Sequence, residues 1–99
     1  MLFYHDGKTA PFAPIKHIDD DVDYGVDWSG RLQPGETVAS SVWVIEEGLT
    51  SSNEINTGLI TGVMLSGGDT SSFYVVSNKI TTSLGRTIHR SMVIECRQL

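Results

Sequence analysis

Asp21-Val22-Asp23-Tyr24-Gly25-Val26-Asp27-Trp28 is the stretch of the sequence that decides the fold. Apolar and polar residues alternate strictly through it, and successive side chains of a β-strand point to opposite faces of a sheet. The alternation predicts a strand whose even-numbered side chains are buried and whose odd-numbered, mostly acidic side chains lie in water.

Further strands follow from the same pattern. The predicted strands are 37–46, 59–66, 72–82 and 87–97, with a short one near 15–18. Segment 37–46 is apolar on both faces, whereas residues 50–58 are polar and predict a loop with at most a short edge strand. Gln33-Pro34-Gly35-Glu36 predicts a type II turn, because proline presets φ and glycine accepts a positive φ.

The composition agrees with a β-rich folded domain. The 99 residues are 39% hydrophobic and 19% charged, and they include nine Val, eight Ile and nine Thr but only three Ala.

No apolar run approaches the roughly 18 residues of a membrane-spanning helix, and the N-terminus lacks the pattern of a secretory signal. A single cysteine, Cys96, excludes an internal disulfide, and a net charge of -5 opposes binding to nucleic-acid phosphates.

About seven short strands separated by turns predict an all-β fold, a two-sheet β-sandwich over residues 15–99. Tyr74 follows the corner 67–72 at the start of the penultimate strand. Immunoglobulin-like sandwiches place there a tyrosine that hydrogen-bonds back to the corner. The predicted core residues are Tyr24, Val26, Trp28, Trp43, Leu65, Tyr74, Val76 and Ile94.

Residues 1–14 differ from the rest and are predicted to form an extended N-terminal arm. Gly7, Pro11 and Pro14 interrupt regular structure, yet the segment carries three aromatic side chains, which disordered tails usually lack. The arm either docks on a partner or folds back over its own sandwich, and the sequence leaves both open. In the first case its aromatic residues are candidate contacts: Phe3, Tyr4 and Phe12.

Catalytic and metal-binding patterns are absent from the sequence. Asp19, Asp21 and Asp23 match the opening of a calcium loop, but Tyr24 and Gly30 occupy the positions where that loop needs glycine and glutamate. The three histidines have no ligand spacing, and Cys96 alternates with apolar residues as a core position does. The sequence predicts no catalytic site, no metal and no cofactor.

Charge is divided unevenly along the chain. Residues 1–49 hold nine acidic and three basic groups, a net of -6, and residues 50–99 hold three acidic and four basic groups, a net of +1. Copies packed side by side could set the early acidic strand of one against the late basic hairpin of another. Arg86 and Arg90 of that hairpin are candidate partner contacts, although segregation of charge without any partner explains the composition equally well.

The ordered motifs resemble a group of short structural proteins of tailed bacteriophages, encoded with head, neck and tail genes. The motifs are 20–24, Val26-Asp27-Trp28-Ser29, Pro34-Gly35-Glu36-Thr37-Val38, 40–43, Leu65-Ser66-Gly67-Gly68 and 74–87. The resemblance covers about residues 19–97. Members often have Leu where Val22 or Asp23 stands, and the first 18 residues are not covered.

The resemblance implies an immunoglobulin-like sandwich that serves as a virion component assembled in the cytoplasm of the bacterial host. It implies a non-enzymatic adaptor that connects tail, neck or fibre parts in several copies, with other phage structural proteins as partners and neither nucleic acid nor membrane among them. Two alternatives stay open: a head-decoration protein that cements capsid subunits, and a module that binds host glycans through loops and exposed Trp.

Overall fold

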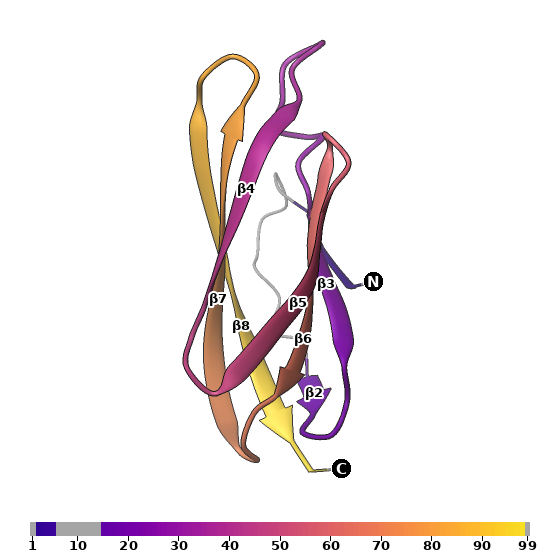
Figure 1. The fold of residues 1–99 in the computed structure, drawn as a ribbon, viewed down its shortest axis with the longest axis vertical. Coiled ribbons are helices and arrows are strands. Elements are labelled where there is room, and N and C mark those ends of the chain that lie inside the picture. The colour runs from indigo at the N-terminus through magenta and orange to yellow at the C-terminus, as the bar shows by residue number, and fades with distance from the viewer. Residues whose placement is uncertain (1, 6–14, 99) are drawn as a thin grey trace.

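The computed structural model describes residues 2–5 and 15–98, and these residues form strands and loops with no helix. Eight strands build two four-stranded sheets that face each other (Figure 1). The predicted two-sheet β-sandwich is therefore confirmed, with eight described strands in place of about seven. Across the same residues, no helix has the length and apolar character needed to cross a membrane.

The first sheet, here called sheet A, contains the strand that the opening alternation predicts. Its strands, in spatial order, are β1 (Leu2–His5), β3 (Val22–Asp27), β6 (Ile60–Gly67) and β5 (Leu49–Asn56). β1 runs parallel to β3, and the other neighbours are antiparallel. In β3, Tyr24 and Val26 point into the sandwich, as the alternation predicts.

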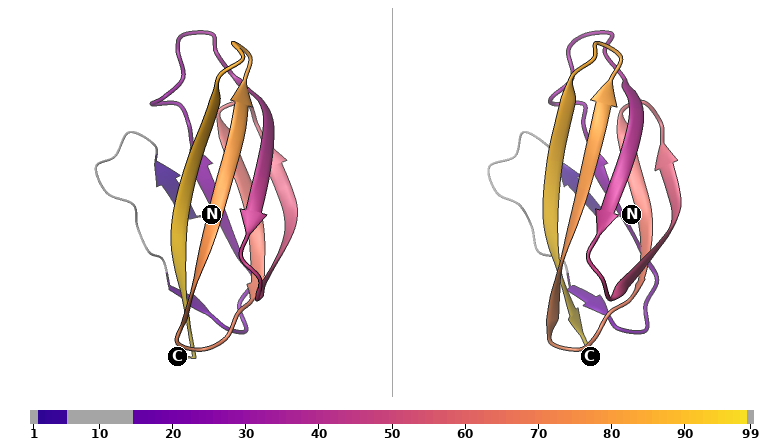
Figure 2. Two further views of the ribbon diagram at one scale, coloured as in Figure 1. Left: turned by 90° about the vertical axis from the view of Figure 1, so that its left-hand side faces the viewer. Right: turned by 60° about the vertical axis from the view of Figure 1, so that its left-hand side comes forward.

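The second sheet, sheet B, is built around the long C-terminal hairpin. Its strands, in spatial order, are β2 (Ile15–His17), β8 (Thr87–Arg97), β7 (Ser72–Thr82) and β4 (Val38–Ile45). Figure 2 shows β4, β7 and β8 side by side in one layer, with β3, β5 and β6 behind them. The connections from β2 to β3, β3 to β4, β4 to β5 and β6 to β7 cross between the sheets, so the two layers are linked several times.

The core fills the space between the sheets with alternate side chains of both. All eight side chains that the sequence places in the core are buried, each at 8% exposure or less. Burying aromatic and branched side chains of this size removes the most apolar surface per residue and is the main favourable contribution to folding.

Residues 50–58 correct the sequence-based prediction of a loop. Leu49–Asn56 form β5, an eight-residue edge strand paired with β6. Only Leu49 of this strand packs against the core, and every other side chain in it is exposed, so no apolar alternation marks the strand. The register shifts between Ser52 and Ile55, where Asn53 has a φ of 51°. Backbone pairing rather than side-chain burial therefore defines β5.

The predicted arm lies largely outside the described residues. Leu2–His5 form β1 and pair with β3 of the same chain, while 6–14, including Phe12, are outside the part that the structure describes. The division into an arm of 1–14 and a sandwich of 15–99 stays a prediction, as does the immunoglobulin-like topology.

Candidate interaction surfaces

A buried chain of hydrogen bonds joins the two sheets at the centre of the sandwich. Trp28 Nε1 donates to Thr61 Oγ1 at 2.9 Å, and the Thr61 hydroxyl donates to Asn78 Oδ1. Asn78 Nδ2 in turn donates to Ser41 Oγ at 2.8 Å and to the Val42 carbonyl at 3.1 Å. Asn78 is the one polar residue among the inward positions 74–80 of β7, and these partners satisfy it. The network is structural, because Trp28, Thr61 and Asn78 are fully buried and their polar atoms bond one another, with only Ser41 at its end partly exposed.

Tyr74 makes the hydrogen bond that its position predicts. The backbone N–H of Asp69 donates to the Tyr74 hydroxyl at 2.9 Å, which ties the start of β7 to the corner before it. The bond back to the corner is confirmed. Gly48 passes close to the same ring, since a Cβ placed on it would lie 2.6 Å from Tyr74 Cε1.

Arg86, a predicted partner contact, forms an ion pair with Glu36 of the same chain. Arg86 Nε donates to Glu36 Oε2 at 2.9 Å and Arg86 Nη2 donates to Glu36 Oε1, while the Glu36 side chain is fully buried. Hydrogen bonds from Arg86 are the main reason that the pKa of Glu36 falls to about 2, and the same ion pair raises the pKa of Arg86. The pair connects the turn before β4 to the turn between β7 and β8.

Lys16 is buried and links the two sheets at the other end of the molecule. Its side chain is 1% exposed, and its Nζ donates to the carbonyl oxygens of His17 at 2.8 Å and Gly67 at 2.7 Å. A buried ammonium needs such partners because desolvation penalises its charge. Lys16 is therefore part of the framework and not of a surface.

Neither the single thiol nor a cluster of metal ligands offers a reactive site in the residues that the structure describes. Cys96 is buried, and burial raises the pKa of its thiol, which opposes the thiolate that nucleophilic attack needs. Between residues 15 and 98, no three His, Cys, Asp or Glu side chains gather as metal ligands do. Two buried donors, the Tyr24 hydroxyl and Trp43 Nε1, have no hydrogen-bond partner among the described residues, and burial raises the pKa of Tyr24 to about 12.

The other predicted partner contacts lie far apart in the fold. Phe3 and Tyr4 belong to β1, at the edge of sheet A, and Phe12 is outside the described residues. Arg90 is half-buried on β8, where its Nη1 donates to the His89 carbonyl at 2.6 Å. The structure does not gather these residues into one site, and their role in partner binding stays a prediction.

The outer face of sheet B, by contrast, collects exposed apolar side chains. Val75 and Val93 are cross-strand partners near its middle, 45% and 38% exposed. Nine large apolar side chains are exposed among the described residues, and six of them share this outer face: Ile15, Val42, Val44, Phe73, Val75 and Val93. An exposed apolar surface that spans four strands is typical of a protein-binding face.

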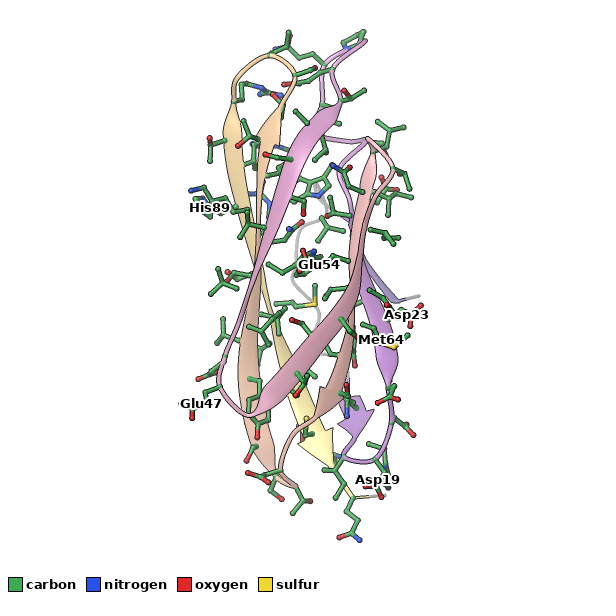
Figure 3. All side chains as sticks on the ribbon, in the orientation of Figure 1. Asp19, Asp23, Glu47, Glu54, Met64 and His89 are labelled. Atoms are coloured by element: carbon green, nitrogen blue, oxygen red, sulfur yellow. The ribbon has the colours of Figure 1, made fainter. Side chains whose placement is uncertain are left out.

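Charge separates between the sheets. The strands of sheet A carry Asp23, Asp27 and Glu54 and no Lys or Arg, a net of -3. The strands of sheet B carry four cations and one anion, a net of +3: Lys16, Lys79, Arg90 and Arg97 against Glu95. Figure 3 shows His89 pointing outward on the sheet B side of the molecule and Asp23 with Met64 pointing outward on the opposite side.

Sequence reasoning missed the apolar outer face. The available signal was segment 37–46, which is apolar at both odd and even positions, so that one of its apolar sets had to lie outside the core. Val42 and Val44 are that set, at 54% and 62% exposure, while Trp43 between them is buried.

A small β-sandwich with a buried carboxylate paired to Arg86, its thiol buried and a broad apolar face outside is built as a structural protein that binds other proteins. A profile of one protein family, described as Podophage GP4 fiber-tail adaptor protein gp77, matches residues 16–95, and the chain belongs to this family. The resemblance to tailed-phage structural proteins is thereby confirmed, and the chain is a structural adaptor of the virion. A search among curated proteins found no match.

Proposed function

We propose that the chain is a non-enzymatic adaptor that joins tail, neck or fibre components of a tailed phage, with several copies in each particle. Its partners are other structural proteins of the same virion, and neither nucleic acid nor membrane is among them. The particle assembles in the cytoplasm of the bacterial host.

The observation that carries the proposal is the extent of the family match. Residues 16–95 reach from β2 into β8 and leave out only β1 among the described strands, so the match covers most of the sandwich. The family is described as joining fibre and tail, and a rigid sandwich with an apolar outer face is suited to such a joint. A role in joining parts other than fibre and tail has less support.

The burial of the Glu36 carboxylate and of the Cys96 thiol supports the non-enzymatic part of the proposal. The carboxylate of Glu36 is buried in its ion pair with Arg86, and the thiol of Cys96 is buried with a raised pKa. A nucleophile or general base must instead reach substrate in an accessible, activated form.

The proposal is tested on phage particles produced without this chain. We expect filled heads and tails without fibres, and we expect added purified chain to restore the fibres, as seen by electron microscopy and infectivity. Mass spectrometry of purified wild-type particles should detect the chain. Particles that carry fibres and infect normally without it would contradict the adaptor role, and finding it on the capsid surface would favour head decoration instead.

A further inference from the structure

The two outer faces of the sandwich are unlike each other in charge. The outer face of sheet A carries Asp23 and Asp27, at the outward positions of β3. The outer face of sheet B carries Lys79 and the ion pair of Arg97 with Glu95, a net of +1, because Lys16 is buried and Arg90 lies at an inward position opposite Asn78. Opposite net charge on opposite faces means that two identical faces repel each other, whereas a sheet A face and a sheet B face attract.

The sheet B face supplies apolar contact as well as positive charge. Lys79 and His89 are cross-strand partners on it, and the pair Val75 and Val93 lies four residues along the same strands. Every second residue of β7 points inward, so Phe73, Val75 and Lys79 all point away from the core. Apolar side chains at the centre with a lysine beside them form a surface that prefers an acidic, partly apolar partner face.

The sheet A face has that complementary chemistry. Asp23 is paired with Met64 and Asp27 with Ile60, so acidic and apolar side chains alternate across β3 and β6. Gly25 and Gly62 are cross-strand partners between those two pairs, and Ile55 of β5, 42% exposed, lies beside Gly62 at the same level. A face with acidic and exposed apolar side chains suits the projecting apolar side chains and the lysine of sheet B in a sheet-on-sheet packing.

We propose that the chain binds a second copy of itself by packing the outer face of sheet B of one copy on the outer face of sheet A of the next. Such a contact joins two different surfaces, so a pair of copies still offers one free face of each kind. Repetition closes into a ring when the rotation between copies permits, or otherwise continues as a stack. The inference rests on the proposed function, because it supplies the contact between copies that a multi-copy adaptor needs.

Analytical ultracentrifugation of the full chain, from about 10 μM to about 1 mM, tests the contact. We expect the mean mass to rise with concentration, and Val93→Asp to weaken association by at least about tenfold because it places a charge in the apolar centre. Leu84→Asp is the matched control: Leu84 is 60% exposed in the turn between β7 and β8, away from both faces. This control should associate like the wild type, and circular dichroism should show all variants folded.

Charge reversal tests which faces meet. Asp23→Lys on sheet A and Lys79→Glu on sheet B should each weaken association, and an equimolar mixture of the two variants should restore it, since Lys on one face then meets Glu on the other. A chain that stays monomeric throughout the concentration range overturns the inference. Association that Asp23→Lys leaves unchanged also overturns it, because sheet A is then outside the contact.

The same variants separate this inference from the proposed function. A monomeric chain that is nevertheless required for fibre attachment would overturn the contact between copies and leave the adaptor role intact. A chain that associates as described but is absent from purified particles would overturn the adaptor role and leave the contact intact.

Discussion

Thr61 on β6 and Asn78 on β7 share a hydrogen bond across the gap between the two sheets. Both side chains are fully buried, and Trp28 and Ser41 extend the network on either side. A shift of one sheet past the other would break the hydrogen bond between Thr61 and Asn78. The network therefore adds positional specificity to a core whose apolar contacts are less directional.

Asn78→Ala should lower the free energy of unfolding by about 2–4 kcal/mol, because it leaves buried partners of the side chain without hydrogen bonds. Urea denaturation followed by tryptophan fluorescence measures the loss. Ser77→Ala is the control, since its hydroxyl bonds Ser91 at the exposed surface of the same strand, and it should cost less than about 0.5 kcal/mol. Equal losses in the two variants would show that the network adds no stability.

Gly48→Ala should destabilise the chain by about 2–4 kcal/mol, since a left-handed backbone and a clash act together. Its φ is 113°, and the added Cβ would lie 2.6 Å from the ring of Tyr74. Gly35→Ala is a matched control with a φ of 80° and no atom within 4 Å of the added Cβ, so it should cost only about 1–2 kcal/mol. Thermal unfolding of both variants checks the difference, and a Gly35 variant as damaged as the Gly48 variant would assign the whole effect to the backbone.

These two glycines also show how far the sequence alone predicts the fold. The turn around Gly35 could be predicted, because Pro-Gly has a local conformational preference, and the hydrogen bond from Glu36 N to Gln33 O at 2.9 Å closes it. The requirement at Gly48 could not, because it comes from the ring of Tyr74, which is distant in sequence.

The same distinction applies to strands and surfaces. Strand β3 was predictable because burial enforces its alternation, whereas β5 was not, because its side chains are exposed and only backbone pairing holds it. The apolar face of sheet B depends on which strands lie side by side, so its residues become one surface only when the pairing is known.

Cys96 should resist thiol reagents as long as the chain is folded, because its side chain is buried and its pKa is raised by that burial. Reaction with a colorimetric disulfide reagent should be slow in buffer and rapid in denaturant. Thr50→Cys provides an exposed thiol on β5 as a positive control, and it should react at once. Fast labelling of the folded wild type would show that the pairing of β8 with β2 or β7 opens readily.

Acid should weaken the fold through Glu36. Its pKa in the folded chain is about 2, below the ordinary value of 4.5, chiefly because Arg86 donates hydrogen bonds to the carboxylate. A carboxyl group with a lowered folded pKa stabilises the chain above its unfolded pKa, and that stabilisation is lost as the pH falls from about 4.5 to about 2. Glu36→Gln should therefore be less stable at neutral pH and should lose less further stability over this interval, as denaturation at a series of pH values measures. Glu54→Gln, an exposed glutamate on β5, is the control and should follow the wild-type pH dependence. An unchanged acid dependence in Glu36→Gln would show that groups other than this ion pair control the acid response.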